Sequence, residues 1–390
     1  MNAAVHLPLP DLAAEFLLRR DIAFLNHGSF GACPRPVFET YQHWQRVLET
    51  QPVAFLGRRI EGLLAEVRAT LGQYLNAAAD DLALVPNATY GVNIVAHALR
   101  LGAEDAIVTT DHEYGAVQRT LRYVCGRSGA QYVEAQVGLP LHDPTEVIER
   151  LWAAVTPRTR LIVISHITSP TALIFPVAEV CRRARAAGIL TLVDGAHAPG
   201  QLDLDLAAIG ADFYTGNCHK WLCAPKGAAF LYVRPECQQL IDPLVVSWGY
   251  ESRRPGASPF VDYFAWTGTA DPAAYLSIPA AIAFQQQHDW AQVRTACRAL
   301  LAEARTRITA LSDQEAVCPD DPGWWQQLAI APLPRCDAEV LKQELYNRHQ
   351  VEVPIIDWGG RQFVRISVQG YNTPDEIDRL EHGIRQLVQV

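Results

Sequence analysis

The chain has 390 residues, 49% of them hydrophobic and 19% charged, a balance typical of globular proteins and not of disordered ones. Its formal net charge is -9 and no run of lysine and arginine stands out, which argues against a nucleic-acid partner. No apolar run is long enough to cross a bilayer, and the N-terminus lacks a signal-peptide pattern. Nine cysteines at irregular spacing favour reduced thiols. We therefore expect a cytoplasmic protein without a membrane anchor.

Short apolar runs alternate with helical patterns through the first two thirds of the chain. The runs predict strands at 82–85, 106–108, 161–164 and 190–193. Between them, apolar residues recur at helical spacing, for example over 60–71. This alternation predicts an α/β fold with a mostly parallel sheet flanked by helices. Ligands in such sheets gather at the carboxyl ends of the strands.

The pattern changes after about residue 270. Two long helical stretches, 273–287 and 290–311, precede short predicted strands near 325–330, 351–355 and 363–367. A final helix is expected after Thr373, with Pro374 at its first position. We predict a large α/β domain over 20–270 and a smaller α+β domain over 271–390.

Two strand ends carry the residues of a cofactor site. Asp194 ends one predicted strand in VDGAHAPGQ, and Lys220 follows another, 212–215, in DFYTGNCHKWL. A pyridoxal phosphate site needs this pair, because the lysine holds the cofactor as a Schiff base and the carboxylate pairs with the pyridine nitrogen. A partly desolvated lysine also becomes a nucleophile and a base.

A third strand end fits the cofactor phosphate. Asn87, Ala88 and Thr89 follow a predicted strand and precede a helical pattern. A helix start presents free N–H groups to a phosphate, the small side chain of Ala88 permits its approach, and the Thr89 hydroxyl can donate a hydrogen bond.

VDGAHAPGQ and GNCHKWLCAPKGAAFL resemble the class V aminotransferase superfamily of fold type I pyridoxal phosphate enzymes. LNHGSFG, VPNAT, SHITSPTALIFP, WTGTADP and VRISVQGYNT follow in the order of its isopenicillin N epimerase-like branch, and the resemblance covers roughly 20–385. It implies a seven-stranded sheet, a segment 1–19 that packs on the smaller domain, and a homodimer that shares its active sites.

The resemblance also implies roles around the cofactor. Tyr114 would stack on its ring, His197 would lie beside the ring, and Ser169 would bond its phenolic oxygen. Asn217 and His219 would lie near its phosphate.

Further residues would serve the substrate and the partner subunit. Arg365 would clamp the substrate carboxylate through two parallel hydrogen bonds. Asn26, His27 and Gly28 would line the substrate mouth. The pair Gly268 and Thr269 would reach the phosphate of the other subunit.

Two departures from the family pattern matter. Asn217 stands where many relatives have serine. The loop 356–361 lacks the cysteine nucleophile of cysteine desulfurases, so persulfide chemistry there is not expected. Cys218 and Cys223 lack two further ligands at matching spacing, so no metal site is expected.

The expected chemistry begins when Lys220 removes the Cα proton of an amino acid. An epimerase or racemase outcome is favoured, because the resemblance is strongest to that branch. A C–S β-lyase of the cystine or cysteine sulfoxide type and an aminotransferase are alternatives. A non-catalytic binding protein on the same fold is another class, which the presence of Asp194, Lys220 and Arg365 disfavours. A second acid or base would be Tyr114, His27 or His197.

Overall fold

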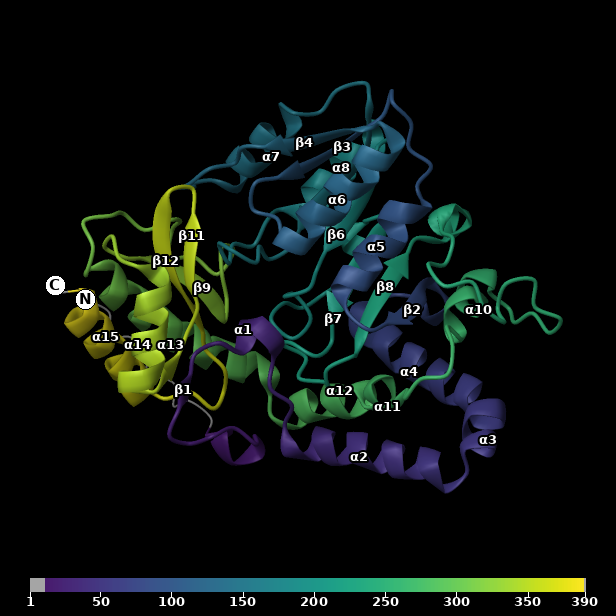
Figure 1. Cartoon of the computed structure of the whole chain (residues 1–390), viewed down its shortest axis with the longest axis horizontal. Coiled ribbons are helices and arrows are strands. Elements are labelled where there is room, and N and C mark those ends of the chain that lie inside the picture. Colours follow the sequence, from purple (N-terminus) through teal and green to yellow (C-terminus); the bar gives the residue numbers. More distant parts are fainter. Residues whose placement is uncertain (1–10, 389–390) are drawn as a thin grey trace.

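The computed structural model describes residues 11–388 and is built around a seven-stranded sheet (Figure 1). The order of the strands is β2-β8-β7-β6-β5-β3-β4. Strand β8 is antiparallel to both neighbours and the other pairings are parallel, which confirms the predicted mostly parallel sheet. The strands are β2 (Leu82–Val85), β3 (Ala106–Thr110), β4 (Gln131–Ala135), β5 (Thr159–Ser165), β6 (Leu190–Asp194), β7 (Phe213–Asn217) and β8 (Ala229–Val233).

Helices cover both faces of this sheet, and apolar side chains fill the two layers between. Helix α5 packs on β7 so closely that a Cβ on Gly91 would stand 2.2 Å from Thr215 Oγ1. Helix α7 begins with a capping box between Asp143 and Glu146. The helices of this part include α2 (Arg35–Thr50), α4 (Ile60–Leu75), α5 (Ala88–Ala98), α6 (Gly115–Ser128), α7 (Pro144–Trp152), α8 (Val177–Ala186) and α9 (Leu206–Ile209).

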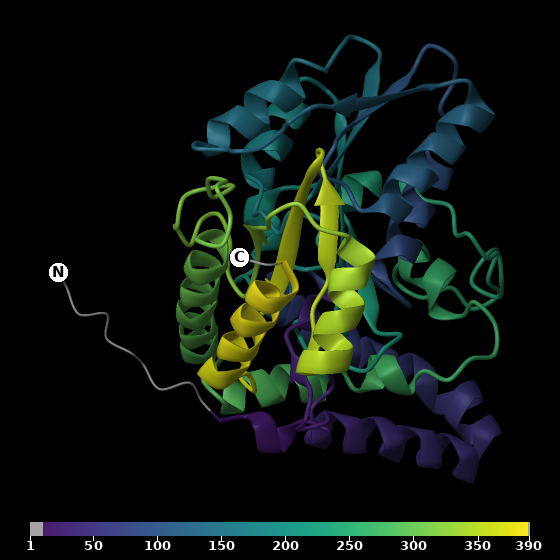
Figure 2. The same cartoon turned by 60° about the vertical axis from the view of Figure 1, so that its left-hand side comes forward.

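A smaller antiparallel sheet of order β11-β12-β9 forms the second part of the fold (Figure 2). Its strands are β9 (Leu328–Pro332), β11 (Ile355–Trp358) and β12 (Arg361–Ser367), and its helices are α13 (Trp290–Thr309), α14 (Ala338–His349) and α15 (Pro374–Val388). Strand β1 (Ala23–Phe24) pairs with β10 (Val351–Glu352), so the chain just after residue 20 lies beside this part.

The boundary at residue 270 stays a proposal. Helices α11 (Ala273–Leu276) and α12 (Ile278–Gln287) follow it, yet they lie against α2 and α4 of the large part. Of the segment 1–19, residues 1–10 lie outside the described range. Leu12 of this segment donates its N–H to Gly370 O of the smaller part.

Some elements differ from the sequence predictions for local reasons. Pro354, which has no N–H to donate, separates β10 from β11 where one strand was predicted. Pro279 lies in the first turn of α12, so the predicted helix 273–287 is two helices. Strand β4 was missed because it is a partly exposed edge strand that lacks a continuous apolar run. Within residues 11–388, no helix is both long and apolar enough to cross a bilayer.

Candidate active site

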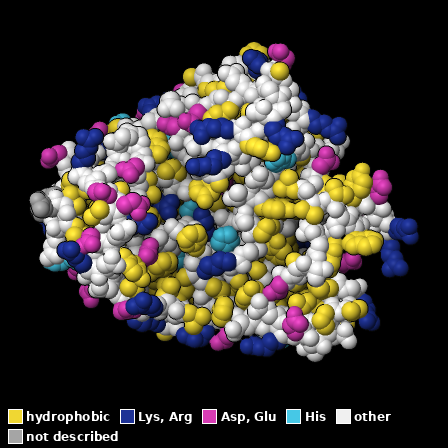
Figure 3. Space-filling view, viewed as in Figure 1, with side chains coloured by type: hydrophobic (Ala, Val, Ile, Leu, Met, Phe, Trp, Pro, Cys, Tyr) yellow, Lys and Arg dark blue, Asp and Glu magenta, His cyan; other side chains and the backbone are white. Residues whose placement is uncertain are grey.

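The carboxyl ends of β2, β3, β5, β6 and β7 lie at one edge of the large sheet, because these five strands run in the same direction. A cavity of about 560 Å³ lies there, and β12 of the smaller sheet contributes to its wall. Histidine and basic side chains gather at a hollow near the centre of the face in Figure 3. The volume is in the range of cofactor and substrate pockets.

Lys220 follows β7 in a tight turn and its side chain lines the cavity. Its Nζ lies 3.1 Å from His197 Nε2. Burial lowers the pKa of Lys220 to about 8, and Arg365 adds to the effect while Asp194 opposes it. Gly31 packs directly against this turn, since a Cβ on Gly31 would stand 2.0 Å from the His219 carbonyl oxygen. A pKa of about 8 gives Lys220 a larger neutral fraction at neutral pH than an exposed lysine has, which would favour its use as a nucleophile.

Asp194 is the last residue of β6 and is buried at the base of the same cavity. Its Oδ1 accepts a hydrogen bond from the Ala196 N–H at 2.9 Å. Burial raises the pKa of this carboxyl, while the nearby Lys220 opposes the shift. A buried carboxylate with one remaining oxygen suits a cationic partner such as a protonated pyridine nitrogen.

The first turn of α5 borders the cavity at the expected phosphate end. Asn87 caps the helix, with its side chain accepting from the Tyr90 N–H at 2.9 Å. Asn217 accepts the Ala88 N–H at 2.8 Å, so it supports the helix start through its carbonyl oxygen. Ala88 and Thr89 both line the cavity.

His219 also lines the cavity and is held by the backbone. Its Nδ1 lies 3.2 Å from the Ala228 carbonyl oxygen, so Nδ1 carries the proton and Nε2 carries a lone pair. Burial lowers the pKa of His219 to about 4, with a further contribution from Lys220. A direct contact with an anionic phosphate would require a second proton on this ring.

Arg365 reaches the cavity from β12 and is almost fully buried. Its Nη1 donates to the Ser169 carbonyl oxygen at 2.5 Å, and its Nη2 lies 3.2 Å from Ser29 Oγ. Its Nε has no hydrogen-bond partner within the described part of the chain. Burial lowers the pKa of Arg365 to about 10, while the Tyr114 phenol opposes the shift, so the guanidinium stays charged. This buried charge without a carboxylate partner suits the carboxylate of a ligand.

Tyr114 lies at the start of α6 and lines the cavity, with 48% of its surface exposed. Ser169 lines the cavity too, and its contacts are with Arg365. Gly28 lines the cavity and donates its N–H to Ser367 Oγ.

Four of the expected site residues do not line this cavity. Asn26 is turned toward Glu352 and Ser29, and His27 is fully buried against Tyr371 and the Lys220 backbone. Gly268 and Thr269 are exposed, and Thr269 lines a different groove.

Sequence reasoning missed several residues that line the cavity. Glu113 is the most consequential, since its buried carboxylate accepts from the Ser165 N–H at 2.8 Å and from the Ser165 hydroxyl at 2.6 Å. Burial raises the pKa of Glu113 to about 8, helped by Asp194. Its position beside Tyr114 at a strand end was the available signal. The other missed residues include Ser29, Phe30, Ser165, Ile167, Pro170 and Ile356.

The site therefore holds an amine, a buried carboxylate, a helix start and an unpaired guanidinium around one cavity. These are the groups that pyridoxal phosphate and an amino-acid substrate require. Lys220 and Asp194 would hold the cofactor ring, the first turn of α5 would hold its phosphate, and Arg365 would hold the substrate carboxylate.

Residues 31–380 match the family described as Aminotransferase class-V. The chain is 36% identical to isopenicillin N epimerase of Amycolatopsis lactamdurans, over 93% of this chain and 94% of that protein. It is 30% identical to a probable chloroplastic L-cysteine desulfhydrase of Arabidopsis thaliana, over 94% and 83%. A solved cystine C–S lyase, in complex with cysteine persulfide, has a TM-score of 0.83 at 22% identity, covering 97% of this chain and all of that one (100%).

The chain belongs to the class V aminotransferase family, as its motifs predicted. It is a pyridoxal phosphate-dependent enzyme of fold type I.

Proposed function

We propose that this enzyme inverts the Cα configuration of an amino acid, as an isopenicillin N epimerase-like epimerase or racemase. The 36% identity to isopenicillin N epimerase over nearly the whole chain supports this choice among the reactions of the family. One observation in the structure carries the first step, namely that Lys220 and Arg365 face one cavity from different sheets. An amino acid whose carboxylate is held by Arg365 presents its Cα to Lys220.

Each charged group has a distinct task in this reaction. Arg365 orients the substrate by its carboxylate, through the guanidinium atoms not engaged by Ser169 and Ser29. Bound pyridoxal phosphate supplies an electron-poor ring that takes up charge from Cα. Lys220, with its lowered pKa, accepts the Cα proton at Nζ when its amine is free.

Inversion requires a proton donor on the face opposite Lys220. His27 does not fit this task, because Tyr371 and the Lys220 carbonyl oxygen engage its two ring nitrogens. His197 lies directly beside the lysine, with its Nε2 3.1 Å from Lys220 Nζ, so it does not suit a donor on the opposite face. Tyr114 is the remaining candidate for the proton donor, since its phenol lies near Arg365 and is partly exposed in the cavity. We assign the second proton transfer to Tyr114.

A C–S β-lyase is the second candidate. L-cysteine desulfhydrases at about 30% identity match nearly the whole chain. No cysteine lines the cavity within residues 11–388, so a lyase at this site would expel sulfur without a protein thiol nucleophile.

Proton NMR in heavy water distinguishes these reactions. The enzyme is incubated with a panel of L-amino acids that includes cystine and a peptide-like amino acid with a bulky side chain, with Lys220→Ala as the control. Loss of the Cα proton signal, with the rest of the molecule intact and both enantiomers found by chiral chromatography, supports epimerisation. Pyruvate or another keto acid would instead favour elimination or transamination.

Borohydride reduction of the enzyme loaded with pyridoxal phosphate tests the part common to all these reactions. Mass spectrometry should find the cofactor on the peptide that carries Lys220 and on no other. A label elsewhere would overturn the whole scheme.

We also propose that two copies of the chain pair so that Gly268 and Thr269 complete the partner's phosphate site. Thr269 lines a groove of about 450 Å³ together with apolar residues of α3 (Pro52–Ala54) and Trp248. Trp248 is 83% exposed and Val53 is 69% exposed, which is typical of surfaces that a partner covers. The segment before α10 (Pro259–Ala265) extends away from the body of the molecule (Figure 1).

Light scattering after size exclusion tests the pairing. The wild type should have twice the mass of the chain, and Trp248→Glu should shift it to the monomer and weaken cofactor retention. Val340→Glu changes another exposed apolar residue, on α14, and should leave the mass unchanged. A monomeric wild type that retains the cofactor would contradict the proposal.

We further propose a cytoplasmic location, supported by nine cysteines that are all free.

A further inference from the structure

The side chains of Trp221, His197 and Lys220 meet beside the cavity, and their contacts bear on which ring nitrogen of His197 is protonated. The indole Nε1 of Trp221 lies 3.3 Å from His197 Nδ1, and His197 Nε2 lies 3.1 Å from Lys220 Nζ. Trp221 is fully buried and His197 is nearly so. The proposed function assigns no task to Trp221.

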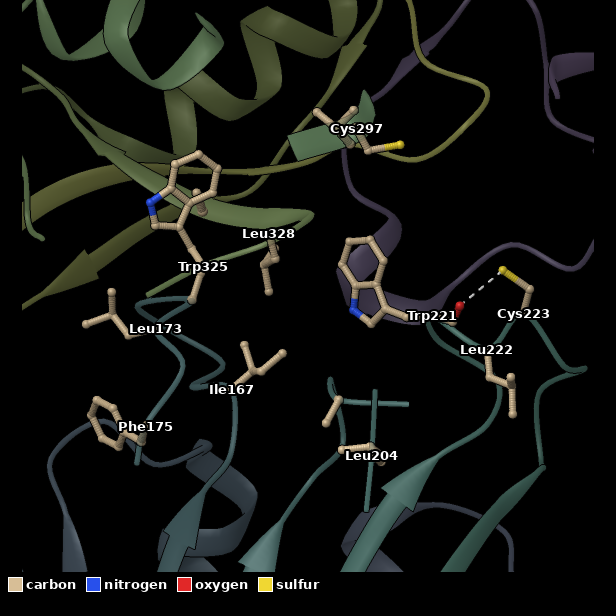
Figure 4. Packing of buried hydrophobic residues seen from close by; sticks show 14 of the residues in the cluster. Ile167, Leu173, Phe175, Leu204, Trp221, Leu222, Cys223, Cys297, Trp325 and Leu328 are labelled. Carbon is tan, nitrogen blue, oxygen red and sulfur yellow. Dashed lines mark hydrogen bonds between the residues drawn. The ribbon is translucent and has the colours of Figure 1, made fainter. Parts of the chain in front are cut away.

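The Trp221 ring is fixed in place by its surroundings. Gln285 Nε2 donates to the Trp221 carbonyl oxygen at 2.8 Å, and the His27 ring lies against the indole with centroids 4.8 Å apart. Gly200 has φ +91, and a Cβ there would stand 2.2 Å from the same carbonyl oxygen. Trp221 belongs to the buried apolar cluster, and Figure 4 shows it among other members such as Leu328 and Cys297. The indole N–H therefore has a constant direction.

An indole nitrogen can donate a hydrogen bond but cannot accept one. Its partner, His197 Nδ1, must therefore offer a lone pair, which places the proton of a neutral His197 on Nε2. That N–H points at Lys220 Nζ, which then has to accept the hydrogen bond. An ammonium has no lone pair, so only a neutral amine can complete this chain of two hydrogen bonds.

We propose that Trp221 is a positioning residue that holds His197 in the tautomer protonated at Nε2 and thereby favours the neutral amine of Lys220. The inference rests on the proposed role of Lys220 as the cofactor lysine. In the opposite arrangement, a charged Lys220 donates to Nε2, and Nδ1–H faces the indole N–H. Two donors would then meet without an acceptor in a buried site, which is costly.

Most of the charged and titratable groups near the pair agree with this arrangement, and Asp194 opposes it. Burial lowers the pKa of His197 well below its ordinary value, and Lys220, Arg365, His219 and His27 all add to this shift, so the doubly protonated ring is excluded. Asp194 is the one nearby group that favours the charged lysine. When the lysine amine is engaged by the cofactor, the same His197 N–H can donate to an anionic ligand oxygen.

Trp221→Phe removes the indole N–H and keeps an aromatic ring in the cluster. Trp325→Phe is its matched control, because Trp325 is also fully buried in this cluster (Figure 4) and its Nε1 has no hydrogen-bond partner within the described residues. Both variants lose the same atoms from a buried indole, and only the first loses the hydrogen bond to His197.

The first readout is nitrogen NMR of the full-length chain with labelled histidine, stripped of cofactor, with His197→Gln identifying the His197 signals. Wild type and Trp325→Phe should show a proton on Nε2 and a lone pair on Nδ1. Trp221→Phe should show the Nδ1-protonated form or a mixture. A proton on Nδ1 in the wild type overturns the proposal even if Trp221→Phe does not fold.

The second readout is the rate at which an amine-reactive reagent labels Lys220 at pH 7 in the same stripped proteins, followed by mass spectrometry. Trp221→Phe should label about fivefold more slowly than wild type, the effect of one neutral hydrogen bond of about 1 kcal/mol. Equal rates for Trp221→Phe and Trp325→Phe overturn the proposal. Borohydride labelling of Lys220 in wild type loaded with pyridoxal phosphate tests the proposed function separately. If Lys220 is labelled there, equal rates count against the role of Trp221 and not against Lys220 as the cofactor lysine.

Discussion

His27 and Lys220 are joined by a hydrogen bond of 3.0 Å between His27 Nε2 and the Lys220 carbonyl oxygen. A carbonyl oxygen only accepts, so Nε2 carries the proton and Nδ1 accepts from the Tyr371 hydroxyl, also at 3.0 Å. This chain of bonds ties α1 (His27–Phe30) and the segment before α15 to the backbone of Lys220. His27 thus acts on the lysine's main chain from outside the cavity.

His27→Phe should destabilise the protein by about 1–3 kcal/mol, because the buried Tyr371 hydroxyl loses its hydrogen-bond partner, whereas the Lys220 carbonyl oxygen keeps the hydrogen bond from the Cys223 N–H. Urea unfolding followed by fluorescence measures this loss. His142→Ala, at an exposed histidine, is the control and should leave the midpoint unchanged. Equal midpoints for all three proteins would show that the bonds contribute nothing.

Arg365→Lys should raise KM for an amino-acid substrate about 10- to 100-fold, because an ammonium cannot form the two parallel hydrogen bonds of a guanidinium. The absorbance of the bound cofactor should not change, since the substituted lysine keeps the positive charge that Arg365 places near Lys220. Arg361→Lys, on the same strand but outside the cavity, should keep the wild-type KM. Steady-state kinetics decides, and an unaltered KM in Arg365→Lys would mean that another group binds the carboxylate.

Glu113→Gln should change how stability depends on pH. The folded-state pKa of Glu113 is raised to about 8, so the native protein keeps a proton that the unfolded chain releases above about pH 4.5. The contribution of Glu113 is therefore complete at low pH and is lost as pH rises toward 8. Relative to Glu113→Gln, which imitates the neutral acid, the wild type should become steadily less stable between pH 5 and 8. Parallel pH profiles of the free energy of unfolding would contradict the raised pKa.

The buried histidines should give the opposite slope at lower pH. Burial lowers the pKa of His27 and His112 to about 3 and that of His166 to about 4, so these rings stay neutral in the folded protein. The unfolded chain binds protons at these groups below about pH 6.5, so their contribution is full above that pH and is lost as pH falls toward 4. Urea midpoints between pH 4 and 7 should therefore rise with pH. Proton uptake on unfolding at pH 5 provides an independent check, and its absence would show that these rings are charged in the native state.

The sequence predicted those site residues whose type fits the chemistry and whose local pattern places them at the end of a strand. Asp194 ends one short apolar strand and Lys220 follows another, so the direction of parallel strands was enough to place both at one edge. The contact between His27 and Tyr371 joins residues 344 positions apart, and no spacing rule reveals such a pair. Glu113 was missed because its position beside Tyr114 at a strand end does not reveal that its carboxyl group is buried. Strand β8 runs opposite to its neighbours, a direction that its apolar composition does not encode.

Under the proposed function, the two ends of the amino acid would be held by different parts of the fold. Lys220 follows a strand of the large sheet, which also carries Asp194 and the helix start for the phosphate, whereas Arg365 lies on the small sheet. Mutations near β12 can therefore alter how an amino acid is oriented above the ring without disturbing cofactor capture. If these roles hold, a change confined to the small sheet could tilt the substrate and so alter the reaction while Lys220 and the cofactor site stay as they are.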